Sequence, residues 1–190
     1  MTDQDAGITG PILGEKAPFF EATVGKSTIN LNDFKGRWLI IITHPDDILP
    51  VFKTQTIKYL LCKRRIKVIA VGNRQPSSDI AGRNFVKRYI MKHSLLMVSD
   101  TNGQIKTCYG LSEPDETSHE ASKGVFVIDP KGMLRINLLS DVSAERNFYE
   151  ILRLVDMLQV EYKQKKKQAR VSRASRPKIV LETGALSEES

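Results

Sequence analysis

The most informative stretch of this 190-residue chain reads Trp38-Leu-Ile-Ile-Ile-Thr-His44-Pro45-Asp-Asp-Ile-Leu49-Pro50-Val51-Phe52. Its first part, residues 38–43, is rich in apolar and β-branched side chains and ends shortly before Pro45. This composition is typical of a central strand that is buried on both faces. Pro50 suits the first turn of a helix, where its missing N–H is not needed. We expect that helix to run to about Lys63, because cations favour the C-terminal end of a helix dipole.

Outward from this stretch, strands and helices alternate along the chain. In chain order we expect a hairpin at residues 23–31, strands at 66–71 and 95–98, helices at 79–92 and 105–109, a strand pair at 125–128 and 133–139, and a final helix after Ser143. The strand pair turns at Asp129-Pro-Lys-Gly132. The final helix keeps its apolar residues at helical spacing. This order predicts an α/β fold, a mixed sheet with helices on both faces.

Four further motifs support a family resemblance. They read Leu13-Gly-Glu-Lys-Ala-Pro18-Phe-Phe, Leu31-Asn-Asp-Phe34-Lys-Gly-Arg-Trp38, Lys123-Gly-Val-Phe-Val-Ile-Asp129-Pro-Lys-Gly132-Met-Leu-Arg135 and Arg146-Asn-Phe148-Tyr-Glu-Ile-Leu-Arg153. Together with the opening stretch, they resemble the peroxiredoxin family of thiol peroxidases over roughly residues 13–160. His44 before Pro45 favours the one-cysteine subfamily. The resemblance implies a thioredoxin-like fold of peroxiredoxin type.

The residues that should carry peroxidase chemistry depart from the family pattern P-x-x-x-[TS]-x-x-C. The family uses a helix-N-terminal cysteine held as thiolate, a Thr or Ser hydroxyl for the peroxide, and an arginine for the developing charge. By the resemblance, these positions are occupied here by Phe52, Leu49 and Lys123, while His44 and Pro45 of the frame are retained. A phenyl ring cannot attack an O–O bond. We therefore expect the usual catalytic mechanism to be absent.

Other residues offer alternative chemistry. Cys62 and Cys108 are the two cysteines of the chain. Cys62 precedes three cations, which favour a thiolate, but it is expected near the buried C-terminal end of a helix, where the dipole disfavours one. Our favoured interpretation is that both cysteines are inert. The alternative is that one of them is a redox-active residue. The positions that match phospholipase-type residues of some one-cysteine members are Asn32, Arg37 and Asp129, and only Asp129 keeps its type.

Length and composition limit the domain organisation, the cofactors and the location that we expect for the protein. The length suggests one domain with extensions, which we divide into a flexible leader at 1–12, the peroxiredoxin-like domain at 13–162 and a largely disordered tail at 163–190. The chain has no run of about 18 apolar residues, the length of a transmembrane helix. Its two cysteines form no metal spacing. We expect no metal, no cofactor, and a cytoplasmic or nuclear location.

The positive charge is concentrated near the C-terminus. The chain carries a net charge of +7, and eight cations follow one another there without an intervening acid: Lys163, Lys165, Lys166, Lys167, Arg170, Arg173, Arg176 and Lys178. The rest of the chain is therefore close to neutral. No aromatic residue interleaves with these cations, so nucleic acid would be bound through phosphates, without sequence preference and with strong salt dependence. An acidic membrane surface is the other candidate partner.

Three functional hypotheses follow. The leading one is a peroxiredoxin-like protein that has lost thiol peroxidase activity and acts as a non-catalytic binding or regulatory partner. The second is an antioxidant thiol-dependent peroxidase that uses Cys62 or Cys108. The third is a polyanion-binding accessory protein that works through its basic tail. The resemblance implies a homodimer, or a heterodimer with an active peroxiredoxin.

Overall fold

The computed structural model describes residues 10–43, 54–72, 88, 90, 92–100, 102–111, 123–139 and 144–174. The chain divides after Tyr149 into two compact units. The first unit contains the whole described sheet, and the second contains most of the last helix.

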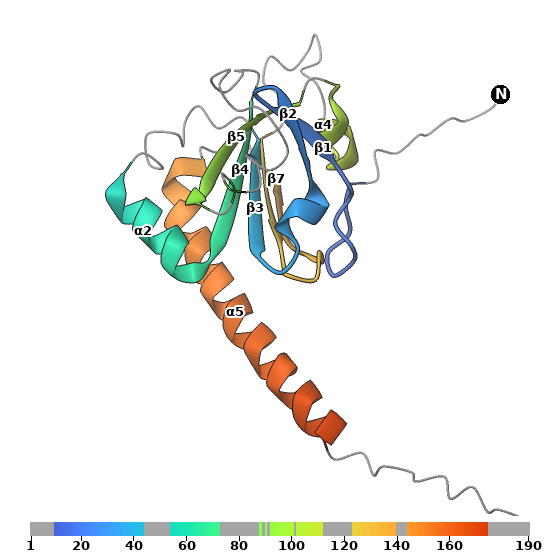
Figure 1. The fold of residues 1–190 in the computed structure, drawn as a ribbon, viewed down its shortest axis with the longest axis vertical. Coiled ribbons are helices and arrows are strands. Elements are labelled where there is room, and N and C mark those ends of the chain that lie inside the picture. The colour runs from blue at the N-terminus through green and yellow to red at the C-terminus, as the bar shows by residue number, and fades with distance from the viewer. Residues whose placement is uncertain are drawn as a thin grey trace, which may run out of the picture. The chain divides into compact units, whose positions relative to one another are not determined.

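Seven strands of the described residues form one sheet in the order β2-β1-β5-β4-β3-β6-β7 (Figure 1). Strands β3, β4 and β5 are parallel, and the other neighbours pair antiparallel. The predicted α/β fold with a mixed sheet is confirmed. The bounds are β1 Glu21–Val24, β2 Ser27–Asn30, β3 Trp38–Thr43, β4 Ile66–Gly72, β5 Leu95–Ser99, β6 Gly124–Ile128 and β7 Leu134–Leu139.

The described α-helices follow the predicted order, and the 3-10 helix was not predicted. They are the 3-10 helix η1 Leu31–Phe34, and the α-helices α2 Gln55–Arg64, α4 Gln104–Cys108 and α5 Ala144–Ala174. Of the helix expected at 79–92, residues 88, 90 and 92 are described and are helical. The remainder of that prediction, and Ser143 as the cap of α5, lie outside the described residues.

Strand β3 is an interior strand of the sheet, between β4 and β6, and all its residues are buried. Ile40 pairs with Val68 of β4 on one side and with Val127 of β6 on the other. A strand paired on both edges and covered on both faces has no exposed position for a polar side chain. This explains the uninterrupted apolar run in the sequence.

Three aromatic residues from distant parts of the chain form the centre of the core. The ring of Tyr109 lies edge-on to Phe126 at 4.8 Å and to Phe20 at 6.4 Å between centroids. Its hydroxyl donates a hydrogen bond to the carbonyl oxygen of Pro18 at 3.1 Å. Aromatic pairs in this geometry add about 0.5–1.5 kcal/mol beyond the area they bury. Tyr109 therefore joins α4 to the segment before β1 and to β6.

The segment before β1 is hydrogen-bonded to β7. The Gly14 amide donates to the Leu134 carbonyl oxygen and the Leu134 amide to the Glu15 carbonyl oxygen, both at 2.8 Å. The side chain of Asn137 donates to the Pro11 carbonyl oxygen at 3.4 Å. The predicted leader, residues 1–12, is thus held at Pro11, and residues 1–9 lie outside the described part of the chain.

Tyr109 makes the free energy of unfolding decrease at alkaline pH. Burial, assisted by the nearby Cys108, raises the pKa of its hydroxyl above the ordinary value of 10.0. The native state therefore holds this proton more tightly than the unfolded chain does. We expect this contribution to be complete below about pH 10 and to fall by up to about 1.4 kcal/mol per pH unit above it.

The test compares wild type with Tyr109→Phe in urea unfolding between about pH 8 and about pH 11. The variant should lose about 1 kcal/mol at the lower pH, because the bond to Pro18 is gone. It should also show the shallower decline at the higher pH. Parallel declines in the two proteins would contradict the assignment.

Candidate functional site

The loop that resembles a peroxiredoxin active site leaves the sheet at the end of β3. There the Thr43 hydroxyl accepts a hydrogen bond from the Gly124 amide at 2.8 Å and lies 3.4 Å from the Gly124 carbonyl oxygen. Lys123, the predicted replacement for the family arginine, directly precedes Gly124 and is half-buried. The Thr43 bond thus ties the start of the loop to the strand that follows Lys123.

The remaining predicted site residues of this loop, His44, Pro45, Leu49 and Phe52, lie outside the described residues. The Thr43 contact itself was not predicted. Its signal in the sequence was a single hydroxyl at the end of an otherwise apolar strand.

The described helix that follows, α2, has its N-cap at Thr54. Thr54 has an extended backbone and its hydroxyl accepts from the Ile57 amide at 3.3 Å, so α2 starts at Gln55. Thr54 is a favourable N-cap because its side-chain oxygen satisfies one of the amides that the helix leaves unpaired. Pro50, the predicted start, lies outside the described residues. No cysteine stands in the first turn of α2, where the dipole would stabilise a thiolate.

Cys62 is exposed, which corrects the prediction of a buried helix end. Ile57 and Leu61, four residues apart, form the buried face of α2, and Cys62 follows about 100° further round the helix. Arg65, in the left-handed conformation, ends the helix directly afterwards. Cys62 thus lies in the last turn, where the dipole opposes a thiolate.

The ionisation of Lys67 in β4 is affected by its burial and by the charges of Arg37 and Cys62. Burial, followed by the charge of Arg37, lowers the pKa of Lys67, while Cys62 acts in the opposite direction. Cys108 ends α4, is half-buried and packs against the core. Both cysteines are free thiols.

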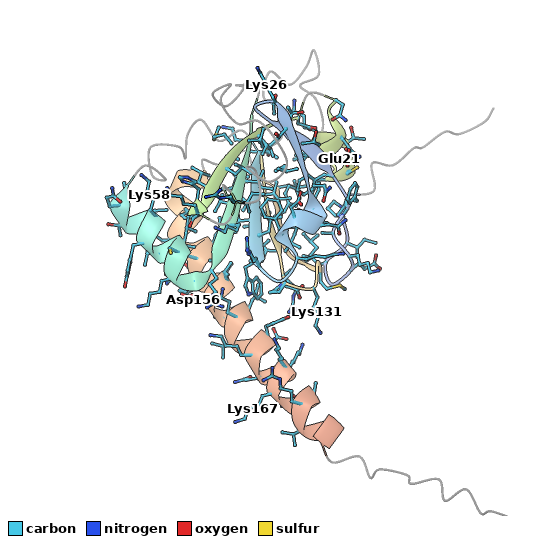
Figure 2. All side chains as sticks on the ribbon, viewed as in Figure 1. Glu21, Lys26, Lys58, Lys131, Asp156 and Lys167 are labelled. Carbon is cyan, nitrogen blue, oxygen red and sulfur yellow. The ribbon has the colours of Figure 1, made fainter. Side chains whose placement is uncertain are left out.

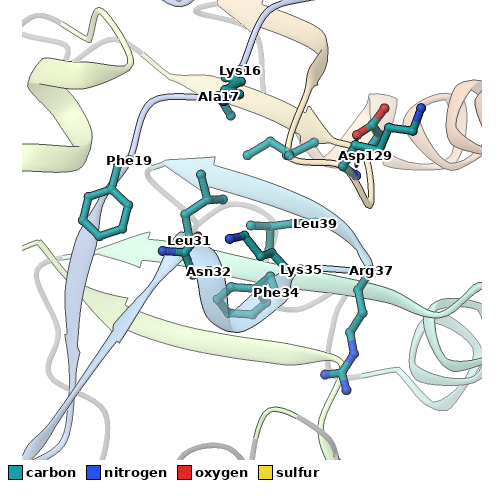
Figure 3. A pocket seen from close by; sticks show the side chains of 13 residues that line it. Lys16, Ala17, Phe19, Leu31, Asn32, Phe34, Lys35, Arg37, Leu39 and Asp129 are labelled. Atoms are coloured by element: carbon teal, nitrogen blue, oxygen red, sulfur yellow. Dashed lines mark hydrogen bonds between the residues drawn. The ribbon is translucent and has the colours of Figure 1, made fainter. Parts of the chain in front are cut away.

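A cavity of about 360 Å³ lies in the first unit, and neither cysteine lines it. Its lining includes Asn32, Arg37 and Asp129, the three positions that match phospholipase-type residues. Figure 3 shows Arg37 extending away from Leu31 and Leu39. The residues that line the cavity are Lys16, Ala17, Phe19, Leu31, Asn32, Phe34, Lys35, Arg37, Leu39, Ile128, Asp129, Lys131 and Gly132. They include no serine, cysteine or histidine. The cavity therefore brings the three positions together, and its lining supplies no hydroxyl, thiol or imidazole side chain.

Asp129 is 4% exposed and its carboxylate is engaged in the turn between β6 and β7. One oxygen, Oδ1, accepts from the backbone amides of Lys131 at 2.8 Å and Met133 at 3.1 Å. The other oxygen, Oδ2, lies 3.6 Å from the guanidinium of Arg135. These contacts explain why this position keeps its type: the side chain closes the turn.

The basic segment is more ordered than predicted. Helix α5 continues to Ala174, so residues 163–174 are helical and not disordered. Lys, Gln, Arg and Ala are good helix formers, and Lys165 forms an ion pair with Glu161 one turn earlier. Lys163, Lys165, Lys166, Lys167 and Arg170 are all exposed. The side chain of Arg173, and Arg176 and Lys178, lie outside the described residues.

The order and directions of the strands, with the described helices, define an α/β domain of thioredoxin-like type. The AhpC/TSA family model matches residues 13–136, more than half of the chain. The chain therefore belongs to the AhpC/TSA family of peroxiredoxins.

Relatives and a solved structure agree with this assignment. The chain is 32% identical over 161 residues to Peroxiredoxin 2 of Caldanaerobacter subterraneus, covering 82% of this chain and 73% of the relative. It is 31% identical over 159 residues to a peroxiredoxin of Aquifex aeolicus, covering 80% and 72%. The mitochondrial 2-cys peroxiredoxin from Plasmodium falciparum has a similar fold, with a TM-score of 0.57 and 21% identity over 77% of this chain and 94% of that one.

The predicted family and the thioredoxin-like fold are confirmed, and the one-cysteine subfamily stays a prediction. In the described part of the chain, no helix is long and apolar enough to cross a membrane. The same residues contain no group of three His, Cys, Asp or Glu side chains placed to hold a metal ion.

The role of Asp129 can be tested by two substitutions. Asp129→Ala removes the acceptor of two part-buried turn amides and should lower the free energy of unfolding by about 1–2 kcal/mol. Asp129→Asn keeps an oxygen in place and should cost less. Urea unfolding of the three proteins measures both effects. An unchanged midpoint in Asp129→Ala would show that the carboxylate does not hold the turn.

Proposed function

We propose that this member of the peroxiredoxin family has lost the usual thiol peroxidase activity and acts as a non-catalytic binding or regulatory partner. The observation that carries the proposal is Phe52 at the position of the reactive cysteine. Leu49 and Lys123, at the positions of the hydroxyl and the arginine, support it. Lysine retains a positive charge but lacks the planar fork that holds two oxygens at once.

A thiol-dependent peroxidase that uses a non-standard cysteine is the alternative. The relatives named as peroxiredoxins favour it, and so does the exposure of Cys62. The place of Cys62 in the last turn of α2 argues against it, because the helix dipole there disfavours the thiolate.

Peroxide consumption by the purified protein with excess dithiol separates the two hypotheses. We expect wild type to consume hydrogen peroxide no faster than the Cys62→Ser/Cys108→Ser double variant, since neither thiol lies at a helix N-terminus. Turnover in wild type that disappears in the double variant would overturn the proposal. The single variants would then identify the reactive thiol.

Partner binding would use the exposed end of the outermost strand. Strand β7 is last in the sheet order, and Leu138 and Leu139 at its far end are 40% and 52% exposed. Among the described residues, the backbone hydrogen bonds of the segment around Gly14 go to the start of β7. An unpaired strand edge with apolar side chains invites pairing with another chain. We infer a homodimer, or a heterodimer with an active peroxiredoxin, through this end.

Sedimentation velocity tests this interface. Leu139→Lys should convert dimers to monomers, because a charge on a strand edge opposes pairing. Tyr59→Lys, which changes an apolar residue of α2 with 63% exposure, is the matched control and should leave the dimer intact. A mixture with an active peroxiredoxin tests the heterodimer. Equal dissociation in both variants, or a monomeric wild type alone and in the mixture, would contradict the inference.

Polyanion binding is a second candidate function. Five cations of the C-terminal segment are exposed on α5, and residues 163–174 contain no acid. Figure 2 shows side chains along this helix, with Lys167 labelled. Such a charge density attracts phosphate-bearing partners at physiological ionic strength. This function and the cytoplasmic or nuclear location remain proposals.

A further inference from the structure

The helical conformation of the basic segment sorts its charges onto one side. An α-helix advances by about 100° per residue, so positions i, i+3, i+4 and i+7 share a face. Lys163, Lys166, Lys167 and Arg170 have this spacing, and all four side chains are exposed. We call these four residues the cationic face. A disordered chain would hold the same charges without any common direction.

The opposite side of the helix has a different character. Lys165 lies there and is paired with Glu161, the single acid among residues 157–174. Ser172 is also on this side, and its hydroxyl donates to the Gln168 carbonyl oxygen at 3.1 Å. Glu161 thus neutralises the charge of Lys165, which lies off the cationic face, and does not reduce the net positive charge of the face itself. Gln164 and Gln168 complete a polar, uncharged surface between the two sides.

The composition of the segment selects among polyanionic partners. Residues 163–174 contain no aromatic side chain, so unpaired bases would find no surface for stacking. Val171 is their one large apolar side chain, and a helix that lies in a membrane interface needs a continuous apolar face. A partner that presents phosphates in a fixed array, without exposed bases or acyl chains, fits best.

Double-helical nucleic acid presents such an array. From Lys163 to Arg170 the helix rises about 10.5 Å, close to the rise of about three base pairs. A rigid helix that carries four cations over this length can contact several phosphates together, with its side chains already facing them. Contacts of this kind position a protein on the duplex and carry no sequence information.

We propose that Lys163, Lys166, Lys167 and Arg170 form a docking face for the phosphate backbone of double-helical nucleic acid, independent of base sequence. This inference rests on the proposed polyanion-binding function and names its partner. The arrangement of the four cations on the helix, and not the total charge of the segment, then determines the affinity for the duplex. If all four cations contact phosphates, the logarithm of the affinity should fall with the logarithm of salt concentration with a slope of about −3 to −4.

The decisive variant keeps composition and charge but moves two cations off the face. Lys163→Gln/Gln164→Lys/Lys167→Gln/Gln168→Lys transfers two positive charges to the polar side of α5. Lysine and glutamine have similar helix propensities, so the helix should persist, and circular dichroism checks this. The full-length protein is titrated against a random-sequence DNA duplex at several salt concentrations. Deletion of residues 163–178 removes the segment and serves as the reference.

We expect wild type to bind the duplex, the deletion to abolish binding, and the relocated variant to bind about tenfold more weakly with a slope smaller by about two. Equal affinity and slope in wild type and the relocated variant would overturn the docking face while keeping polyanion binding by diffuse charge. No duplex binding by wild type would overturn both proposals. Tighter binding to vesicles of an anionic phospholipid than to duplex would overturn the choice of partner.

Discussion

The structure depends on the burial of β3 on both faces and its pairing along both edges. Its register with β4 and β6 brings the strands after residues 65 and 123 into one sheet. The Thr43 hydroxyl at its end satisfies the Gly124 amide. An unsatisfied buried amide at this point would cost about 1–3 kcal/mol, so the Thr43 hydroxyl fixes the end of β3 against the start of β6. Lys123, which directly precedes Gly124, is positioned through this contact.

The stability of such a sheet is largely independent of the chemistry at its edge. The core is built from β3 and its neighbours and from the aromatic contacts of Tyr109. A reactive cysteine and a catalytic hydroxyl would add little to that burial, because each exposes polar atoms to substrate. With Phe52 and Leu49 in their place, as we propose, the family fold can therefore persist. Membership of the family and retention of its activity are separate conclusions.

Much of the fold could be predicted from the sequence, since period and composition are local properties. The strand at residues 38–43 is confirmed residue by residue, because a doubly buried strand requires an unbroken apolar run. The exposure of Cys62 could not be predicted in this way. Tyr59, Leu60, Leu61 and Cys62 read as one apolar cluster, but a helix turns them in different directions and buries only Leu61 fully. The cavity escaped prediction because its lining comes from three separate segments.

The same rotation of a helix changes the meaning of the basic segment. Read as a sequence, residues 163–178 are a run of charge, and a run of charge predicts a solvated tail. Read on α5, the spacing of its lysines separates a cationic side from a side where Lys165 meets Glu161. Diffuse charge attracts any polyanion, whereas a rigid face favours a partner with charges in fixed positions. The helix thus gives the positive charges of the segment fixed relative positions. Because two polyanions of equal charge can differ in the spacing of their phosphates, these positions can discriminate between them.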